Sequence, residues 1–221
     1  MVVRIDVVLG GLMIAAPYGS RNRMFDSHQI LSSATSGLGL GPSYPADVRR
    51  FTSADGTHSV GVFRVSDCPD SGVDSWGTVA MSFFYNGMKS PAGKLLQIEL
   101  VTAAGSEWDV PGSALASCAL RLAEGGTSCN YDAIFRDAFT HGTQQVTTPH
   151  AIFIPPITWG EFSKLDDDDA SILWLQMVGI TSEEAEYARA HSVDALSELF
   201  EQTQPDIYDL QRQSALVYPA I

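Results

Sequence analysis

Cys129 and His141 come nearest to a catalytic arrangement in this sequence. A thiol becomes a nucleophile when a nearby base takes its proton, so a cysteine paired with a histidine is compatible with an enzyme that forms a covalent intermediate. Nothing in the sequence places these two residues together, however. We therefore name no catalytic residue, and we keep an unrecognised enzyme only as an alternative function.

The common catalytic and cofactor-binding motifs do not occur in the chain. The sequence contains no GxSxG, P-loop, GxGxxG, HExxH or CxxC pattern. The glycine-rich "SGLGLG" at residues 36–41 lacks the lysine of a phosphate-binding loop, and we interpret it as a flexible loop. These observations predict a protein without a cofactor.

The potential metal ligands do not form a recognisable site either. The five histidines are scattered, and their spacing puts no two of them on one helical face. The acidic run offers carboxylates to calcium, but it lacks the alternating ligands and the glycine of an EF-hand loop. We predict no bound metal, and we interpret the run as a solvated loop between strands: Asp166, Asp167, Asp168 and Asp169.

Tryptophans and acidic residues are the candidates for contact with a partner, because aromatic side chains often anchor protein interfaces. Trp108 lies in the polar segment "GSEWDVPG", and Trp159 follows Pro155 and Pro156. The alternative for each indole is packing beneath a loop. We predict a partner-binding surface that includes Trp108, Trp159, Asp166, Asp167, Asp168 and Asp169.

Composition and charge restrict the class of partner. The 221 residues include 13 Lys and Arg against 26 Asp and Glu, which gives a formal net charge of −13. Such a protein repels nucleic acid and anionic lipid, so we expect neither as a direct partner, and it attracts a basic protein. The alternative is that the charge serves solubility alone.

The cysteine count and the N-terminal apolar run bear on the cellular compartment. Three cysteines without CxxC spacing fit reduced thiols, and therefore the cytoplasm. The run at residues 7–16 is too short to cross a bilayer, which needs about 20 residues. Because Asp6 precedes it where a signal peptide is normally positive, we favour a buried strand or a mis-called start codon over a secretion signal.

The alternation of apolar residues predicts several strands. Residues 58–65 and 76–85 are β-branched and aromatic with turn residues between them, which predicts a hairpin. Residues 94–101 alternate so that Gln97 and Glu99 should face water. Pro155 and Pro156 should stop a short strand that begins at residue 151, and the apolar run 171–178 should be a central strand.

Helical spacing is clearest in three segments. Apolar residues at positions 115, 118, 119 and 122 predict a helix that buries Cys118 and ends near residues 125–126. Thr181 and Glu184 form a capping-box pattern, with Ile180 and Ala185 as the hydrophobic staple. A last helix should run from Ser192 to near Pro205.

Together these elements predict an α+β fold in which helices pack on a mixed, largely antiparallel sheet. Residues 17–50 are rich in Gly, Ser and Pro and predict a loop, with a short helix near residues 24–31. We therefore expect a poorly defined segment at residues 1–50 and one domain at residues 51–221.

The C-terminal pattern resembles the end of the Suppressor of fused domain. The resemblance rests on residues 172–202 and 206–216, where an apolar strand leads into an Ile-Thr helix start, a helix of "ALxxLFE" type and a terminal Arg-Ser segment. "FFYNGMK", "IELV" and "IFIPPITW" match looser upstream features, although Lys89 replaces the usual Ser. The matching residues are Ile180, Thr181, Glu184, Leu196, Leu199, Phe200, Arg212 and Ser214.

This resemblance, over residues 58–217, implies a non-enzymatic binding domain. Animal relatives hold a transcription factor, whereas compact bacterial relatives are regarded as immunity proteins against polymorphic toxins, many of them nucleases. The length of the chain favours the bacterial group. We expect an immunity protein that occludes a basic toxin domain; the alternatives are an adaptor for another intracellular protein and an unrecognised enzyme. The sequence leaves the oligomeric state open.

Overall fold

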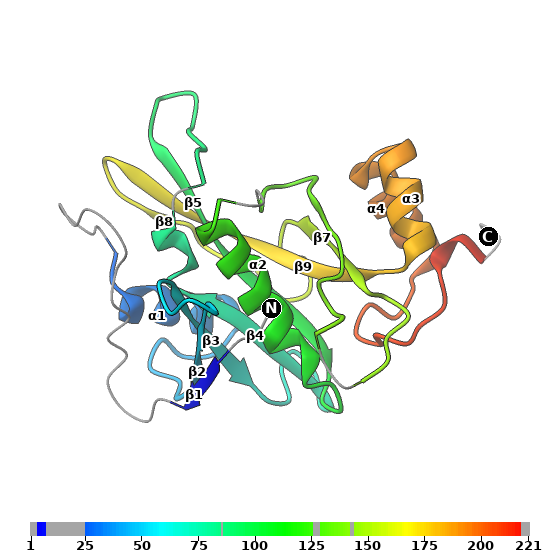
Figure 1. The fold of residues 1–221 in the computed structure, drawn as a ribbon, viewed down its shortest axis with the longest axis horizontal. Coiled ribbons are helices and arrows are strands. Elements are labelled where there is room, and N and C mark those ends of the chain that lie inside the picture. The colour runs from blue at the N-terminus through cyan, green and yellow to red at the C-terminus, as the bar shows by residue number, and fades with distance from the viewer. Residues whose placement is uncertain (1–3, 8–24, 85, 126–128, 142–143, 218–221) are drawn as a thin grey trace.

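A computed structural model describes residues 4–7, 25–84, 86–125, 129–141 and 144–217, and it confirms the predicted α+β class (Figure 1). The helices are α1 (Ser27–Gly37), α2 (Val110–Ala123), α3 (Ser182–Ala190) and α4 (Val193–Thr203), with short 3-10 turns η1 (Met81–Phe83) and η2 (Ala215–Val217). The strands are β1 (Arg4–Val7), β2 (Asp47–Thr52), β3 (Ser59–Val65), β4 (Val73–Val79), β5 (Leu95–Gly105), β6 (Ile134–Phe135), β7 (His150–Ile154), β8 (Leu165–Asp166) and β9 (Ala170–Ile180).

The strands form one mixed sheet in the order β1-β2-β3-β4-β5-β9-β7-β6, with β8 paired to β9. Every pairing among the described strands is antiparallel except that of β5 with β9, which is parallel. The long strands β5 and β9 therefore lie at the centre of the sheet, and their side chains are covered on both faces.

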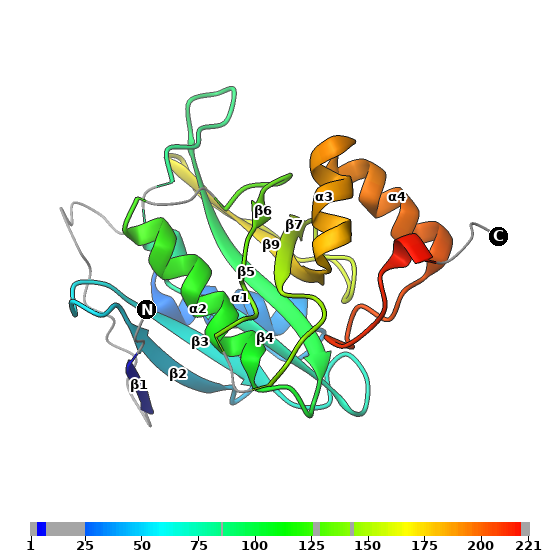
Figure 2. The same ribbon diagram turned by 45° about the vertical axis from the view of Figure 1, so that its right-hand side comes forward.

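Helices α1 and α2 cover opposite faces of the sheet (Figure 2). Successive side chains of a strand point to opposite faces. On β3, Val60 and Val62 belong to the core cluster that includes the apolar residues of α2, whereas Phe63 and Val65 belong to the cluster that includes those of α1. The alternation of β3 thus builds two cores, one on each side.

A third apolar cluster holds α3 and α4 at one end of the sheet, beside the C-terminal segment (Figure 1). Ile152 of β7 and Ile180 of β9 pack there with Ala185 of α3 and Leu196 of α4. This cluster positions the candidate site described below.

Most of the predicted elements are confirmed. Strands β3 and β4 form the predicted hairpin, β7 ends directly before Pro155, and β9 lies centrally between β5 and β7. Helix α2 buries Cys118 completely, as its apolar spacing indicated. Helix α4 begins after Ser192, whose side chain accepts the backbone N–H of Ala195, and buries Val193 and Leu196.

Several boundaries differ from the sequence prediction: β4 begins at Val73 instead of residue 76, and β5 continues to Gly105 instead of ending at residue 101. The loop expected at residues 17–50 contains α1, which begins after Asp26 because Asp26 and Gln29 form a reciprocal capping box, and which continues to Gly37; it also contains the first residues of β2. The second strand of the hairpin stops at Val79, since Ala80 adopts a left-handed φ of 77° and turns the chain into η1. Residues 80–84 therefore leave the ladder instead of extending it.

The prediction that Glu99 faces water is wrong. Its side chain is 0% exposed, because β5 lies inside the sheet with both faces covered. Four donors satisfy the carboxylate: the hydroxyls of Thr78 and Ser82 at 2.5 and 2.6 Å, and the backbone N–H groups of Ser82 and Met81 at 2.9 and 3.3 Å. Burial nevertheless raises the pKa of Glu99 above its usual value, against the hydrogen bonds, which lower it.

The described residues test only some of the predictions for the N-terminal segment. β1 pairs with β2, and α1 packs within the second core cluster. The buried strand predicted at residues 7–16 lies outside the described residues except for Val7. The division into residues 1–50 and 51–221 stays a prediction. Among the described residues, no helix is both long and apolar enough to cross a bilayer.

Candidate functional site

A groove of about 640 Å³ lies between α4, the ends of β7 and β9, and the segment that follows α4. Its polar lining includes four carboxylates, from Asp194, Glu198, Glu201 and Asp206, and we call it the acidic groove. Among the described residues that line it there is no Lys, Arg or His. The groove therefore joins a concave shape with charge of one sign.

Helix α4 supplies three of the four carboxylates by its spacing. Asp194, Glu198 and Glu201 fall at i, i+4 and i+7, so they share one face of the helix. Val193 and Leu196 occupy the buried face. All three acidic side chains are exposed, and neither they nor Asp206 form an ion pair with a described residue.

The buried part of the acidic groove is apolar. Buried Ile154 and Val178 lie at the floor, with half-buried Phe200 and Ile207 beside them. At its edge, Ile157 is 69% exposed and adds apolar surface to the lining. The site can therefore offer apolar contact beside the carboxylates of α4 and Asp206.

Tyr131 also lines the groove and is 41% exposed. Its hydroxyl donates a hydrogen bond to the carboxylate of Asp194, and this bond raises the pKa of Tyr131 to about 12. The phenol therefore stays neutral at physiological pH and adds no charge to the groove.

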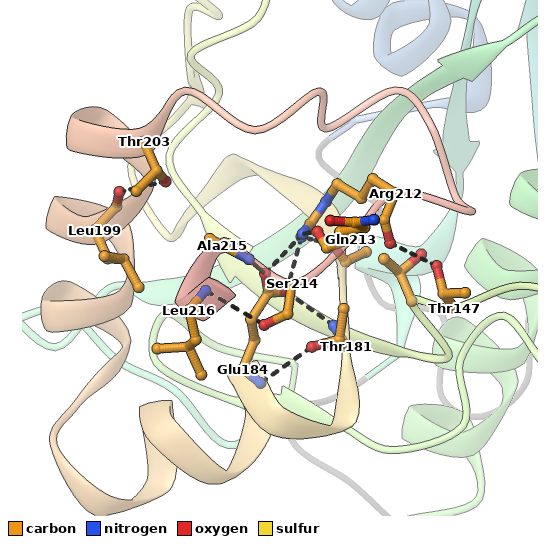
Figure 3. A network of polar contacts seen from close by, with 12 residues as sticks. Thr147, Thr181, Glu184, Leu199, Thr203, Arg212, Gln213, Ser214, Ala215 and Leu216 are labelled. Atoms are coloured by element: carbon orange, nitrogen blue, oxygen red, sulfur yellow. Dashed lines mark hydrogen bonds and ion pairs between the residues drawn. The ribbon is translucent and has the colours of Figure 1, made fainter. Parts of the chain in front are cut away.

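A buried ion pair between Glu184 and Arg212 lies next to Phe200, which forms part of the groove wall, and Figure 3 shows the two paired side chains. Both carboxylate oxygens of Glu184 on α3 accept from the guanidinium of Arg212, which also donates to the carbonyl of Gly179 on β9 at 3.0 Å. The same guanidinium lies 5.1 Å from the ring centroid of Phe200 on α4. Arg212 thus connects β9, both C-terminal helices and the segment that follows them.

Glu184 is held in place by the predicted capping box. Its carboxylate accepts the backbone N–H of Thr181 at 2.9 Å, and the Thr181 hydroxyl accepts the backbone N–H of Glu184 at 3.2 Å. The carboxylate also accepts the backbone N–H of Ala215 at 2.7 Å, which ties η2 to α3. One side chain therefore both starts α3 and anchors the C-terminal segment.

Trp108 and Trp159 lie in the core, not in the acidic groove. They are 5% and 7% exposed, which corresponds to the packing alternative that the sequence left open. Trp159 donates from its indole nitrogen to the hydroxyl of Ser75 at 2.8 Å and stacks edge-on with Phe162. Because little of either ring is accessible, we place neither in the surface proposed below.

The four-aspartate run forms the turn between β8 and β9. Lys94 and Lys164 both pair with Asp166, and these contacts lower the pKa of its carboxyl. Asp167 accepts the backbone N–H groups of Asp169 and Ala170 and so closes the turn. Two of the four carboxylates are engaged locally, and partner contact through this run stays a prediction.

The structure gives Cys129 and His141 separate surroundings. Cys129 is buried, its thiol contacts the carbonyl of Cys118, and burial raises the pKa of Cys129 to about 12. His141 lines a different hollow with Arg64, Trp76 and Asp109. Within the described part of the chain, no group of three or more His, Cys, Asp or Glu is arranged to hold a metal ion.

Sequence reasoning missed the acidic groove, although one of its signals was present. The i, i+4, i+7 spacing of acidic residues on α4 is visible in the sequence. Tyr131 and Ile157, by contrast, come from loops far from α4 in the sequence, and only the packing of the third apolar cluster brings them near it.

Comparisons with known proteins identify relatives of this chain. A family model described as Suppressor of fused protein (SUFU) matches residues 56–213. A protein named Immunity protein YqcF, from Bacillus subtilis (strain 168), is 28% identical over 170 residues, which are 76% of this chain and 88% of that protein.

Solved structures extend the comparison to the fold. A Suppressor of fused homolog from Neisseria gonorrhoeae is 19% identical, with a TM-score of 0.59 over 86% of this chain and 96% of that one. A chain in the crystal structure of the Sufu–Fu complex is 12% identical, with a TM-score of 0.58 over 85% and 91%. At these identities the likeness establishes the fold, and the resemblance inferred from the C-terminal pattern is confirmed.

Proposed function

The chain belongs to the Suppressor of fused protein family, and from this premise we propose that it is a protein-binding module that acts as an immunity protein. In this proposal it binds a toxin domain inside the cytoplasm and covers the surface on which the toxin acts. The observation that carries the proposal is the similarity to Immunity protein YqcF, which extends over 88% of that protein.

The charge of the chain supports a basic toxin. A net charge of −13 attracts a cationic surface over long range and speeds encounter with it. A toxin that grips nucleic acid must itself be positive where it contacts phosphate. An acidic protein that occludes such a surface then competes directly with the substrate, so a nuclease domain is the class of toxin that fits best.

The proposed mode of action is occlusion, with no reaction catalysed by this chain. The three cysteines are free and buried, and burial raises the pKa of each thiol, so none is set up as a nucleophile. Free thiols also suit a reducing compartment. Neutralisation by occlusion requires only a stable complex, and a rigid sheet covered on both faces is a suitable scaffold for one.

Co-expression tests this proposal. The chain, carrying an affinity tag, is produced together with the C-terminal domain of the toxin encoded beside its gene, and the two are purified through the tag. We expect a stable complex with one-to-one stoichiometry. An unrelated toxin domain of similar charge should not copurify. Failure of the neighbouring toxin domain to copurify, with both proteins folded, would refute an immunity role for that pair.

The Sufu–Fu complex favours a second candidate function. A chain in that complex shares the fold, which fits a module that binds a regulatory protein of the cell instead of a toxin. Gene neighbourhood separates the two candidates, because an immunity gene should lie next to a large secreted toxin gene. An isolated gene whose product binds a housekeeping protein would support the adaptor.

A further inference from the structure

We propose that the acidic groove is the docking site for an extended segment of the partner that carries Lys or Arg beside apolar side chains. This inference rests on the proposed function and adds to it the surface that binds and the chemistry that it recognises. Three properties of the groove support it: uncompensated charge, an apolar floor and a fixed wall.

The charge of the groove is not neutralised within the described chain. No described cation lines it, and its four carboxylates make no ion pair with described residues. The C-terminal end of α4 lies beside the groove and adds the negative end of the helix dipole. A concave surface of one sign concentrates the opposite charge, so cationic side chains are the natural ligands.

The spacing of the carboxylates favours a polypeptide over a single ion. Neighbouring positions on one helical face are about 5–6 Å apart at Cβ, so Asp194, Glu198 and Glu201 lie along the groove and do not converge on one point. A chain with several basic side chains can meet them in succession. The same negative charge repels nucleic acid and anionic lipid.

The apolar floor explains why the segment should also carry apolar residues. Buried Ile154 and Val178 offer apolar surface that a purely polybasic chain would leave uncovered. The volume of about 640 Å³ lies within the range of about 300–1,000 Å³ that is common for ligand sites. Long Lys and Arg side chains can lay their methylene stems on such a floor while the charged groups reach the acidic rim.

The wall of the groove is fixed before any partner arrives. Phe200 lies against the buried guanidinium of Arg212, and that guanidinium is held by Glu184 and by the carbonyl of Gly179. A preformed site loses less conformational freedom on binding than a flexible one. The turn at residues 166–169 is a weaker candidate, because two lysines already pair with Asp166.

Charge reversal inside and outside the groove tests the inference. The groove variant combines Glu198→Lys and Glu201→Lys; the control combines Asp168→Lys and Asp169→Lys. Each pair of substitutions raises the net charge by the same four units, and all four side chains are exposed. The probe is a fluorescent peptide of alternating leucine and arginine, with a leucine–glutamate peptide as the blank, and binding is measured by anisotropy.

We expect the groove variant to bind the leucine–arginine peptide at least about tenfold more weakly than wild type, and the control to change binding less than about threefold. Ile157→Ser should weaken binding without altering charge, because it removes an exposed apolar contact at the rim. Equal losses in groove and control variants, or binding of the arginine peptide no tighter than the glutamate peptide, would overturn the inference.

The toxin complex separates this inference from the proposed function. If wild type copurifies with the toxin domain and the folded groove variant does so equally well, the docking site is wrong while the immunity role stands. If wild type itself fails to copurify, the proposed function fails, and the peptide measurement still decides whether the groove takes basic segments. Circular dichroism of each variant establishes that it is folded.

Discussion

The guanidinium of Arg212 and the carboxylate of Glu184 meet in the core through two parallel hydrogen bonds of 2.6 and 2.8 Å. The side chains are 4% and 0% exposed, and they come from the segment after α4 and from the first turn of α3. Because this pair joins elements that line the acidic groove, the stability of the C-terminal end and the shape of the site depend on the same contact.

Removing one partner of this pair should destabilise the protein strongly. Arg212→Ala leaves the carboxylate of Glu184 buried without its counter-charge, and breaking such a pair typically costs about 3–5 kcal/mol. We expect a loss of that size in the free energy of unfolding, measured by chemical denaturation. Arg189→Ala is the control, because Arg189 pairs with Glu186 at the surface, where the loss should stay below about 1 kcal/mol. Similar losses for both variants would contradict this account of the buried pair.

The helix start at Thr181 gives a smaller and more local prediction. Thr181→Ala removes the oxygen that accepts the backbone N–H of Glu184, which should cost about 1 kcal/mol of unfolding free energy. Thr181→Ser keeps the hydroxyl and should retain most of the stability. Equal losses in the two variants would mean that the methyl group of Thr181, and not the cap, supplies the stability.

Buried Glu99 predicts a pH dependence of stability. Its folded pKa is raised by burial, so the folded protein keeps a proton that the unfolded chain releases. The contribution of Glu99 to stability is therefore full below the ordinary glutamate pKa and is lost as pH rises through the folded pKa. Glu99→Gln cannot titrate, so the stability of wild type relative to this variant should decrease as pH rises from about 5 towards 8.

Denaturation of both proteins across that pH range measures the effect. Ser82→Ala provides a second check, because the Ser82 hydroxyl donates to the carboxylate at 2.6 Å and lowers the pKa of Glu99. Its removal should shift the loss of stability to higher pH. A difference between wild type and Glu99→Gln that is the same at every pH would show that Glu99 titrates alike in both states.

The charge of the chain predicts that salt slows association with a basic partner. Attraction between opposite charges acts over a Debye length, which shrinks to about 8 Å at physiological ionic strength. In stopped-flow mixing with the toxin domain, the association rate constant should fall markedly between low and physiological salt, while dissociation changes less. An association rate that does not depend on salt would remove electrostatic steering from the account.

Local signals made much of the fold predictable. Thr181 and Glu184 are three residues apart, and each side chain binds the backbone N–H of the other. Because this pattern stabilises a helix start by itself, it could be recognised in the sequence. The continuous apolar run of β9 requires cover on both faces, which only a central strand has. The burial of Cys118 was predictable from helical spacing, because the residues that share its face of α2 are apolar.

The features that the sequence did not predict, namely the burial of Glu99 and the acidic groove, depend on tertiary packing. Glu99 alternates with apolar residues as an exposed residue would, and only the donors supplied by Thr78 and Ser82 make its burial possible. The acidic groove needs Ile157 and Asp194 in one lining, which depends on how α4 packs on β7 and β9. No spacing along the chain encodes that distance, so the site could not be located from the sequence.

Stoichiometric inhibition is the most direct test of the claim that this chain acts by binding. Increasing amounts of the chain are added to a fixed, micromolar amount of the toxin domain, and the remaining toxin activity is measured. We predict a linear decrease that reaches zero at one chain per toxin, with activity recovered when the complex is dissociated. Lasting inactivation by a small fraction of an equivalent would contradict the account, because it would mean that the chain acts as a catalyst.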